Sequence, residues 1–232
     1  MVTKQDLLDG LVGYWKVDET TGTTGKDEVG TLDFDLTGWT INQNGKIGRS
    51  IAHSTGNGFD TGHSFFGDDW SIGMWIKYAD TSAIMFFTNN YGTTSLARFQ
   101  ANAAGQGSYR YVNFGNTVFS ATTVSSRNEP GEWIHLVVTK SGSTLTLYYN
   151  GQSIASGSTG TNRGGRPTFF RSDSTNVTGT EMDEAFSYDR ALNSTEVSAL
   201  YDIQKDGFTN GSYPFDALGI VSPFPSFRRR TT

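Results

Sequence analysis

Residues 133–151 constrain the fold of this chain more than any other stretch. They read WIHLVVTKSGSTLTLYYNG, with apolar residues at every second position in both halves. An alternation of period two predicts β-strands, and the polar residues 140–143 between the halves predict a turn in which Gly142 can adopt a positive φ. Asn150-Gly151 is a dipeptide that favours a type I′ turn, here leading into residues 152–155. The stretch therefore predicts a meander of three antiparallel strands.

Two segments carry apolar or aromatic residues on both faces of the expected strand. In residues 133–138, alternate positions hold Ile134, Leu136 and Val138 on one face and Trp133, His135 and Val137 on the other. Residues 70–78 place five bulky apolar residues on one face and Trp75 on the other. Strands of this kind lie between two layers. We therefore expect both segments to be central strands of a sandwich.

The remaining chain reads as a series of short strands separated by Gly-rich turns. Strands are expected at 11–17, 31–36, 47–52, 58–60, 84–88, 95–100, 109–114, 117–121, 166–171 and 181–188, and residues 20–30 predict a loop. Within 11–17, Leu11, Trp15 and Val17 are expected to share a face. Asn193 and Glu196 have the spacing of a capping box, which predicts one short helix after the last strand. The first nine residues predict a helical lead-in.

Composition limits the size, the partners and the redox chemistry of the chain. A length of 232 residues suits one all-β domain of about 200–250 residues, and 16 Phe, 10 Tyr and 5 Trp concentrate apolar area in bulky side chains. A formal net charge of −5 argues against a nucleic-acid partner. With no cysteine, disulfides and thiolate metal sites are excluded. Residues 1–9 lack the apolar core of a signal peptide and no apolar run reaches the ~18 residues of a membrane span, so we expect a soluble protein made in the cytoplasm.

A wider set of motifs resembles one known family. The Trp-x-His strand, its Gly turn and Asn-Gly are joined by LVGYWKVDE at residues 11–19 and by MDEAFSYDRAL at residues 182–192, followed by Glu196, Leu200 and Tyr201. This combination resembles the laminin-G-like, concanavalin A-like jelly-roll domains over residues 10–203. The resemblance implies an all-β, two-sheet antiparallel jelly-roll sandwich with one short C-terminal helix, a lead-in at 1–9 and an extension at 204–232. Since the same sandwich hosts lectins, adhesins, passive spacers and glycan-cleaving enzymes, the fold alone does not define the function.

Catalytic chemistry has one candidate, the acidic segment 181–184. A retaining glycosidase needs two carboxyl groups ~5 Å apart, and Glu181 and Asp183 would share a face of a strand. The enzymes that this segment resembles place a further Glu two residues after the Asp, where this chain has Ala185, and Glu184 is expected on the opposite face. His135 occupies a position that the resemblance assigns to packing. We therefore expect a binding protein and not an enzyme.

A structural calcium ion is implied by the resemblance, because relatives often hold one between the start and the end of the domain. Calcium prefers several carboxylate and carbonyl oxygens. Four acidic residues could converge there, namely Asp18, Glu19 and Asp27 near the first strand and Asp183 on the last. The alternative is that these acids are solvated or cap turns.

Carbohydrate binding is the leading functional hypothesis. Sugars are held by an aromatic ring under their apolar face together with amide and charged hydrogen-bond partners. A loop and two nearby strands supply such residues, Asn89, Asn90, Tyr91, Arg98, Tyr109 and Tyr111. The alternative is that the tyrosines only reflect high β-propensity. The sequence thus predicts a non-catalytic carbohydrate-binding or adhesion module whose partner is a glycan or a host cell-surface polysaccharide.

The end of the chain differs in character from the rest. Residues 204–232 are rich in Pro, Phe and Arg and include Phe224, Phe227, Arg228, Arg229 and Arg230. These residues either dock on their own domain or bind a neighbouring subunit. A single jelly roll with no export signal, no cysteine, no catalytic constellation and such a tail favours a phage virion component, a fibre or decoration protein that joins other virion proteins or forms a homo-oligomer through this tail. A purely structural capsid or tail cement protein without glycan binding is one alternative, and a glycan-cleaving enzyme is the least favoured.

Overall fold

The computed structural model describes residues 2–54, 59–60, 69–79, 85–89, 97–101, 109–113, 116–121, 131–158, 167–169 and 178–207. Eight of the described strands form one antiparallel sheet, called here the large sheet. In spatial order its strands are β14 (Gln152–Ser158), β13 (Thr144–Tyr149), β12 (Trp133–Ser141), β7 (Trp70–Lys77), β16 (Glu181–Tyr188), β5 (Arg49–His53) and β4 (Trp39–Asn44), with β1 (Leu11–Trp15) also paired to β16. The predicted meander of residues 133–155 therefore forms one end of this sheet, and its last strand extends to Ser158.

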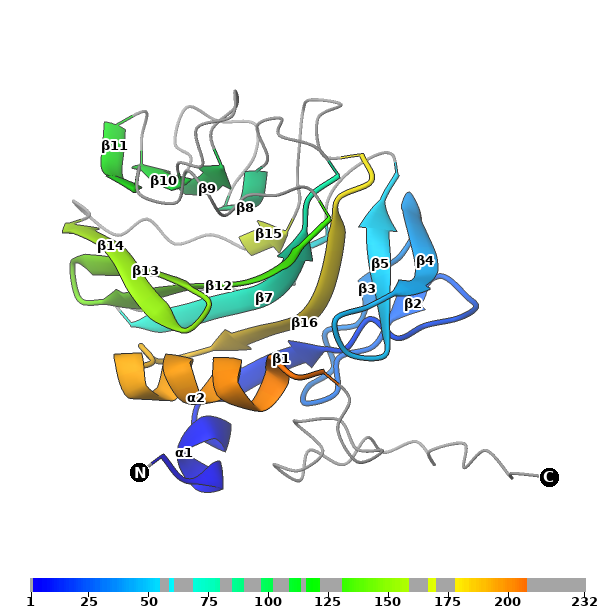
Figure 1. Ribbon diagram of the computed structural model, residues 1–232, viewed down its shortest axis with the longest axis horizontal. Coiled ribbons are helices and arrows are strands. Elements are labelled where there is room, and N and C mark those ends of the chain that lie inside the picture. Colours follow the sequence, from blue (N-terminus) through cyan, green and yellow to red (C-terminus); the bar gives the residue numbers. More distant parts are fainter. Residues whose placement is uncertain are drawn as a thin grey trace.

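Six further described strands form a second antiparallel sheet, called here the small sheet. Its order is β11 (Asn116–Ala121), β10 (Tyr109–Asn113), β9 (Ala97–Ala101), β8 (Met85–Asn89), β15 (Pro167–Phe169) and β6 (Phe59–Asp60). A separate pair joins β2 (Thr24–Gly25) to β3 (Phe34–Asp35). The small sheet lies over the concave face of the large sheet (Figure 1). The all-β, two-sheet architecture confirms the predicted fold class.

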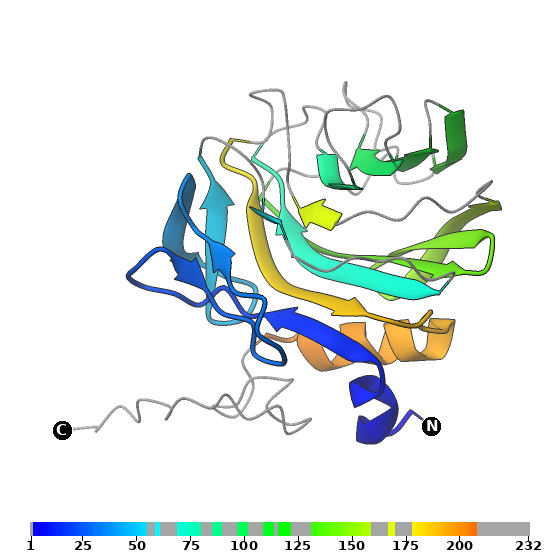
Figure 2. The ribbon, with the colours of Figure 1, turned by 180° about the vertical axis from the view of Figure 1, so that it is seen from behind.

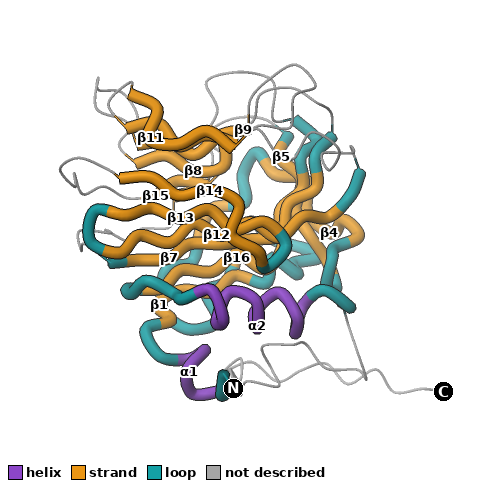
Figure 3. Tube along the Cα trace, turned by 60° about the vertical axis from the view of Figure 1, so that its left-hand side comes forward, coloured by secondary structure: helices purple, strands orange, loops and turns teal. Residues whose placement is uncertain are grey.

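Two helices lie on the other side of the large sheet. Helix α2 (Ser194–Gln204) runs along the convex face, and α1 (Lys4–Leu8) sits beyond it near the N-terminus (Figures 2 and 3). Asn193 Oδ1 accepts the backbone N–H of Glu196 at 3.0 Å, and the Glu196 carboxylate accepts the N–H of Asn193 at 2.8 Å. This is the capping box that the sequence predicts. No helix in the described part of the chain is long and apolar enough to cross a membrane.

The central strands of the large sheet are buried on both faces, each face by its own cluster of apolar side chains. The first cluster faces the small sheet and includes Ile72 and Met74 of β7 and Leu136 of β12. The second faces the helices and includes Val137 of β12 and Leu200 of α2. Each buried side chain of this size contributes about 1.5–3 kcal/mol. The expectation that residues 70–78 and 133–138 form central strands is confirmed.

The turns of the meander also follow the sequence. Asn150 and Gly151 adopt positive φ angles of 48° and 79°, as a type I′ turn requires, and Gly142 has a φ of 54°. The N–H of Asn150 donates to the carbonyl of His135 at 2.8 Å, which ties this turn to β12. The local chemistry of these turns therefore sets the register of β12, β13 and β14.

The first strand is shorter than predicted, and its faces differ from the expectation. Strand β1 ends at Trp15, and its pairing with β16 shifts between Leu11 and Gly13. A register shift of this kind inserts an extra residue and reverses which side chains share a face. Leu11 consequently packs with Tyr14 in the second cluster, whereas Trp15 and Val17 pack in the first. The prediction that Leu11 shares a face with Trp15 is wrong.

The region between β1 and β5 departs furthest from the predicted strands. Only Phe34 and Asp35 of the expected strand 31–36 form β3, and its partner β2 lies within the segment 20–30 that predicts a loop. Strand β4 is not predicted at all. Its pairing with β5 shifts between Thr40 and Gln43, and Asn42 has a φ of 62°. That irregularity interrupts the alternation by which a strand is recognised.

Candidate functional site

Four of the predicted sugar-binding residues fall on strands of the small sheet. Asn89 ends β8, Arg98 lies on β9, and Tyr109 and Tyr111 lie on β10. The backbone pairing of these strands is described, and it decides which positions share a face. The predicted residues Asn90 and Tyr91 lie outside the described residues, as do the tail residues Phe224, Phe227 and Arg228 to Arg230.

One face of the small sheet carries a continuous row of aromatic positions. Directly paired residues in antiparallel strands share a face. The register pairs one residue of each strand in turn across the sheet, in the order Phe119, Tyr111, Phe99, Phe87, Phe169 and Phe59. Tyr109, two residues from Tyr111 on β10, belongs to the same face. So does Asn89, which pairs with Ala97.

The opposite face carries mostly polar positions, with Met85 and Val112 as apolar members, since Met85 pairs with Gln100. Arg98 pairs with Thr88 on one side and with Val112 on the other. Thr88 pairs in turn with Thr168, and Thr168 with Asp60. Arg110 pairs with Gln100 and Ser120 and occupies the same polar face, because it alternates with Tyr109 and Tyr111. We call this set the polar face: Asp60, Met85, Thr88, Arg98, Gln100, Arg110, Val112, Thr117, Ser120 and Thr168.

The structure thus divides the predicted site between two faces. Asn89, Tyr109 and Tyr111 share the aromatic face, whereas Arg98 lies on the polar face. Sequence reasoning did not single out Arg110 or Gln100, which the register brings next to Arg98. The alternation in 97–101 and 109–113 carries the signal, but the pairing of β9 with β10 is needed to use it.

The acidic segment of β16 is shaped by a β-bulge. The pairing of β16 with β7 shifts between Asp183 and Phe186, and Glu184 has a φ of 51°. The extra residue brings the Glu184 carboxylate beside Asp183, where the Tyr14 hydroxyl donates a hydrogen bond to Glu184 Oε2. The prediction that Glu184 lies on the face opposite Asp183 is therefore wrong.

These carboxyl groups are buried, and the charge of Glu184 raises the proton affinity of Asp183. Asp183 and Glu184 are both fully buried, and Asp183 Oδ2 accepts the N–H of Ile47 at 2.8 Å. Burial, together with the charges of Glu184 and Asp18, raises the pKa of Asp183 well above its usual range. Burial and the neighbouring Glu184 likewise raise the pKa of Tyr14. The cluster links β1 to β16 inside the protein.

Glu181, the other half of the candidate catalytic pair, takes part in a different interaction. Its carboxylate forms an ion pair with Lys77 at 2.8 Å and accepts a hydrogen bond from Ser50 Oγ at 3.0 Å. Lys77 and Glu181 occupy paired positions on β7 and β16. Asp183, the second carboxylate of the candidate catalytic pair, instead accepts a hydrogen bond from the backbone N–H of Ile47 in the interior. The two carboxylates thus serve separate structural contacts.

The residues of the predicted calcium site are mostly occupied with backbone amides. Asp27 accepts N–H groups from Tyr14 at 3.1 Å and Val29 at 3.0 Å. Asp18 accepts the N–H of Arg49 at 2.6 Å, and Glu19 that of Lys26 at 2.8 Å. Among the residues that the structure describes, no three acidic or histidine side chains form a group that could hold a metal ion. Calcium binding at these residues stays a prediction.

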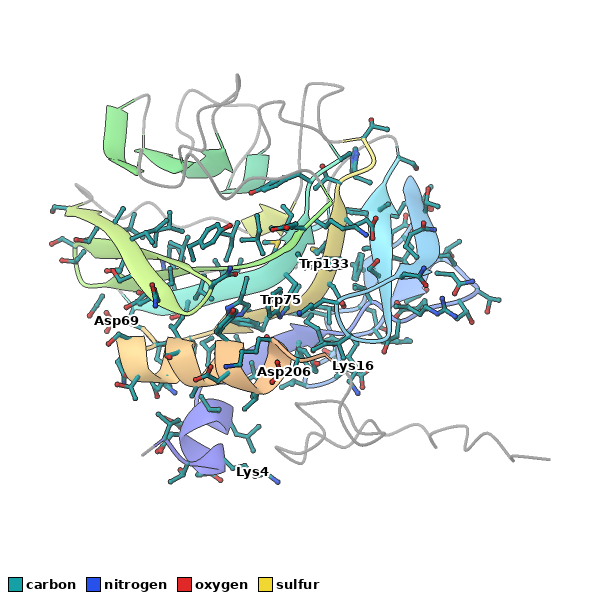
Figure 4. All side chains as sticks on the ribbon, viewed as in Figure 1. Lys4, Lys16, Asp69, Trp75, Trp133 and Asp206 are labelled. Carbon is teal, nitrogen blue, oxygen red and sulfur yellow. The ribbon has the colours of Figure 1, made fainter. Side chains whose placement is uncertain are left out.

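His135 is a packing residue, as the resemblance implies. It is fully buried, and its ring centroid lies 5.1 Å from that of Trp75 and 6.0 Å from that of Tyr201. Burial lowers the pKa of His135 to about 3. Trp75 lies between the large sheet and α2, where its Nε1 donates to Gln204 Oε1 at 2.9 Å (Figure 4). The neutral imidazole therefore helps to fasten α2 to the sheet.

The two packed sheets and the polar face define the class of protein: an all-β, jelly-roll-like sandwich with a candidate binding face on its smaller sheet. Within this class, the family model of the concanavalin A-like lectin/glucanases superfamily matches residues 53–198. The chain belongs to this family, which confirms the resemblance predicted from its motifs. No curated protein sequence matches the chain.

Solved structures show the same fold at low identity. The binding domain of Paraclostridial Mosquitocidal Protein 1 gives a TM-score of 0.64 at 22% identity, over 84% of this chain and 52% of that one. The binding domain of botulinum neurotoxin serotype D gives 0.63 at 10%, over 84% and 52%. Trypanosoma rangeli sialidase in complex with sialic acid gives 0.60 at 15%, over 83% and 32%. The chain therefore spans about half or a third of these proteins.

Proposed function

We propose that this chain is a carbohydrate-binding module that acts by binding and not by turnover. The observation that carries the proposal is the division of the small sheet into an aromatic face and a polar face. In a two-sheet sandwich the face with bulky apolar residues packs against the partner sheet, and the polar face meets solvent. Arginine, glutamine and threonine positions on an outer face supply the hydrogen-bond partners that sugar hydroxyls need.

The state of the acidic residues supports binding over cleavage. A retaining glycosidase directs two carboxyl groups at one glycosidic bond. Glu181 is held by Lys77 and Ser50, and Asp183 is buried against the backbone of Ile47. The superfamily contains both lectins and glucanases, so the arrangement of these acids is what favours the lectin class.

The test is a glycan array probed with the full chain, combined with incubation on a panel of polysaccharides. We expect retention of at least one glycan class and no release of reducing ends. Arg98→Ala should weaken retention, while Lys26→Ala, which removes an ion pair with Asp33 outside the small sheet, should leave it unchanged. Binding to no glycan, or cleavage of one, would contradict the proposal.

We further propose that the module works on a phage particle, as a fibre or decoration protein that binds a host cell-surface polysaccharide. A chain with no cysteine can complete its folding in a reducing host cytoplasm before assembly. The Phe and Arg residues at 224–230 would join it to other virion proteins or to further copies of itself. The alternative is a cement protein that binds no glycan.

Oligomeric state and glycan binding separate these two roles. Light scattering after size exclusion should show an oligomer for the full chain and a monomer for the Phe224→Ser, Phe227→Ser variant. A cement protein would give the same oligomer with an empty glycan array. A monomer in both cases would leave a free lectin and remove the assembly role.

A further inference from the structure

Asparagine is followed by glycine at four places in the chain, and the structure describes two of them. Asn44-Gly45 lies at the turn after β4 and Asn150-Gly151 at the turn after β13, whereas Asn57-Gly58 and Asn210-Gly211 lie outside the described residues. Glycine has no side chain to shield its backbone nitrogen, so this nitrogen can approach and attack the side-chain amide of the preceding asparagine. In a folded protein the rate of this reaction depends on how firmly the turn holds the asparagine.

The turn after β13 holds Asn150 in place. Asn150 Oδ1 accepts the backbone N–H of His135 at 2.9 Å, and the N–H of Asn150 donates to the carbonyl of His135 at 2.8 Å. Gly151 is buried, and a Cβ added there would lie 3.0 Å from Tyr201 of α2. The Asn150 amide must leave the N–H of His135 before it can react, and a buried N–H without a partner is costly. This turn therefore protects Asn150.

The turn after β4 holds Asn44 less firmly. The side chain of Asn44 is exposed, and its Oδ1 accepts a hydrogen bond from Arg49 Nη1 at 3.2 Å at the surface. The N–H of Gly45 donates to the carbonyl of Gly48 at 3.3 Å, which is longer than a usual N–H···O bond. Both groups that must meet, the Asn44 amide and the Gly45 nitrogen, are thus held by long hydrogen bonds.

The turn of residues 45–48 also joins separate parts of the fold. Ile47 is fully buried, and its N–H donates to Asp183 Oδ2 on β16 at 2.8 Å. Lys46 Nζ donates to the carbonyl of Lys205 at the end of α2, and this turn lies beside the C-terminal end of α2 in Figure 1. A longer backbone at the start of this turn would displace both contacts.

We propose that Asn44-Gly45 is a modification site at which Asn44 deamidates without an enzyme, and that the isoaspartate so formed loosens the turn 45–48 from α2 and β16. The Gly45 nitrogen gives up its proton and forms a bond to Cγ of Asn44, the bond from Cγ to Nδ2 breaks, and ammonia leaves. A water molecule then opens the succinimide ring.

The ring opens at either of its two carbonyl carbons. Breaking the bond between Cγ and the Gly45 nitrogen gives aspartate in a normal backbone, whose carboxylate can pair with the guanidinium of Arg49. Breaking the bond between the backbone carbonyl carbon of residue 44 and the Gly45 nitrogen gives isoaspartate. The backbone of isoaspartate runs through Cβ and Cγ and is longer by one CH2 group, so this product disturbs the turn.

The first test compares the two asparagines in the folded and the unfolded chain. The full chain is kept at a mildly alkaline pH, because base favours loss of the glycine N–H proton, and timed samples are digested and analysed by mass spectrometry. In the folded protein Asn44 should deamidate about tenfold faster than Asn150, because Asn150 must first give up its bond to a buried strand. In urea the two rates should converge, since neither turn is then formed.

The second test measures the effect of the product on the fold. Aged wild type should melt at a lower temperature than fresh protein, and an isoaspartyl methyltransferase, which returns isoaspartate to aspartate, should restore the melting temperature. Asn44→Gln closes the ring far more slowly and keeps the other three Asn-Gly steps, so it should lose less on ageing. Freshly prepared Asn44→Asp has the normal backbone and should melt like fresh wild type.

Each other outcome overturns a stated part of the inference. Equal rates at the two sites in the folded protein, a faster reaction at Asn150, or protection of Asn44 relative to urea would overturn the modification site. Deamidation at Asn44 with an unchanged melting temperature would overturn the loosening of the turn and leave the site standing. An equal loss in aged Asn44→Gln would assign the loss of stability to another Asn-Gly step.

Discussion

The two sheets of this protein contrast in how their faces are used. The central strands of the large sheet are buried on both faces, so that β7 and β12 expose almost no side chain to solvent. The small sheet alternates an aromatic row with polar positions. Substitutions in a sheet that is covered on both faces reduce the stability of the fold, because they disturb close packing. In a sheet with one polar face, that face can change without changing the core. The large sheet is therefore the part that stabilises the fold, and the small sheet is the part that we expect to bind a glycan.

The largest effect is expected from a cavity in the large sheet. Phe186 is fully buried, and its ring packs against Gly73, so close that an added Cβ there would lie 2.3 Å from it. Phe186→Ala should lower the free energy of unfolding by about 3–5 kcal/mol, as measured in urea. Val29→Ala, at an exposed position, should change it by less than about 0.5 kcal/mol. Loss of glycan binding in the folded fraction of Phe186→Ala would break the contrast between the sheets.

The next effect is a pH dependence located between the large sheet and α2. The pKa of His135 is about 3 in the folded protein and near 6.5 in the unfolded chain. Between these values only the unfolded chain takes up the proton, so stability falls as the pH is lowered, by at most about 1.4 kcal/mol per pH unit. His135→Phe should flatten this slope in urea unfolding measured from pH 6.5 to pH 4. An unchanged slope would assign the acid sensitivity to other groups.

A calcium titration tests whether a bound ion adds to the stability of the large sheet. If the predicted site at Asp18, Glu19, Asp27 and Asp183 binds calcium, chelator-treated protein should take up the ion with measurable heat and melt at a higher temperature. Calcium at about a hundred times its Kd would stabilise the fold by roughly 2.7 kcal/mol. Asp18→Asn should reduce the shift. No heat and no shift would remove the site.

The smallest effect compares a cation on each sheet. Lys77→Met breaks the ion pair with Glu181. Because both side chains of this pair are partly exposed, we expect a loss of stability of only about 0.2–1 kcal/mol. Arg110→Met, at a position of the polar face of the small sheet, should change stability by less than about 0.5 kcal/mol, yet it should weaken glycan binding. Thermal melts and calorimetry of the two variants together would show whether stability and recognition are divided between the sheets.

Much of the fold could be predicted where local chemistry is decisive. The capping box at Asn193, the turn at Asn150-Gly151 and the alternation in 70–78 each depend on residues a few positions apart, and all three are confirmed. Bulges are different. Those near Gly13 and Glu184 reverse the face of the residues around them, and they form where β16 pairs with β1 on one side and with β7 on the other. No short-range pattern marks them.

The candidate site follows the same division. The sequence by itself determined the strand alternation, the bulky apolar residues of the core and the presence of arginine, asparagine and tyrosine between residues 89 and 111. Only the tertiary structure decided that the positions of Arg98 and Arg110 share one face of the small sheet and that Tyr111 lies on the other face. This depends on how β9 is aligned with β10. A shift of one residue in this pairing would turn every side chain to the other face, and the alignment is set by contacts between strands that no single segment contains.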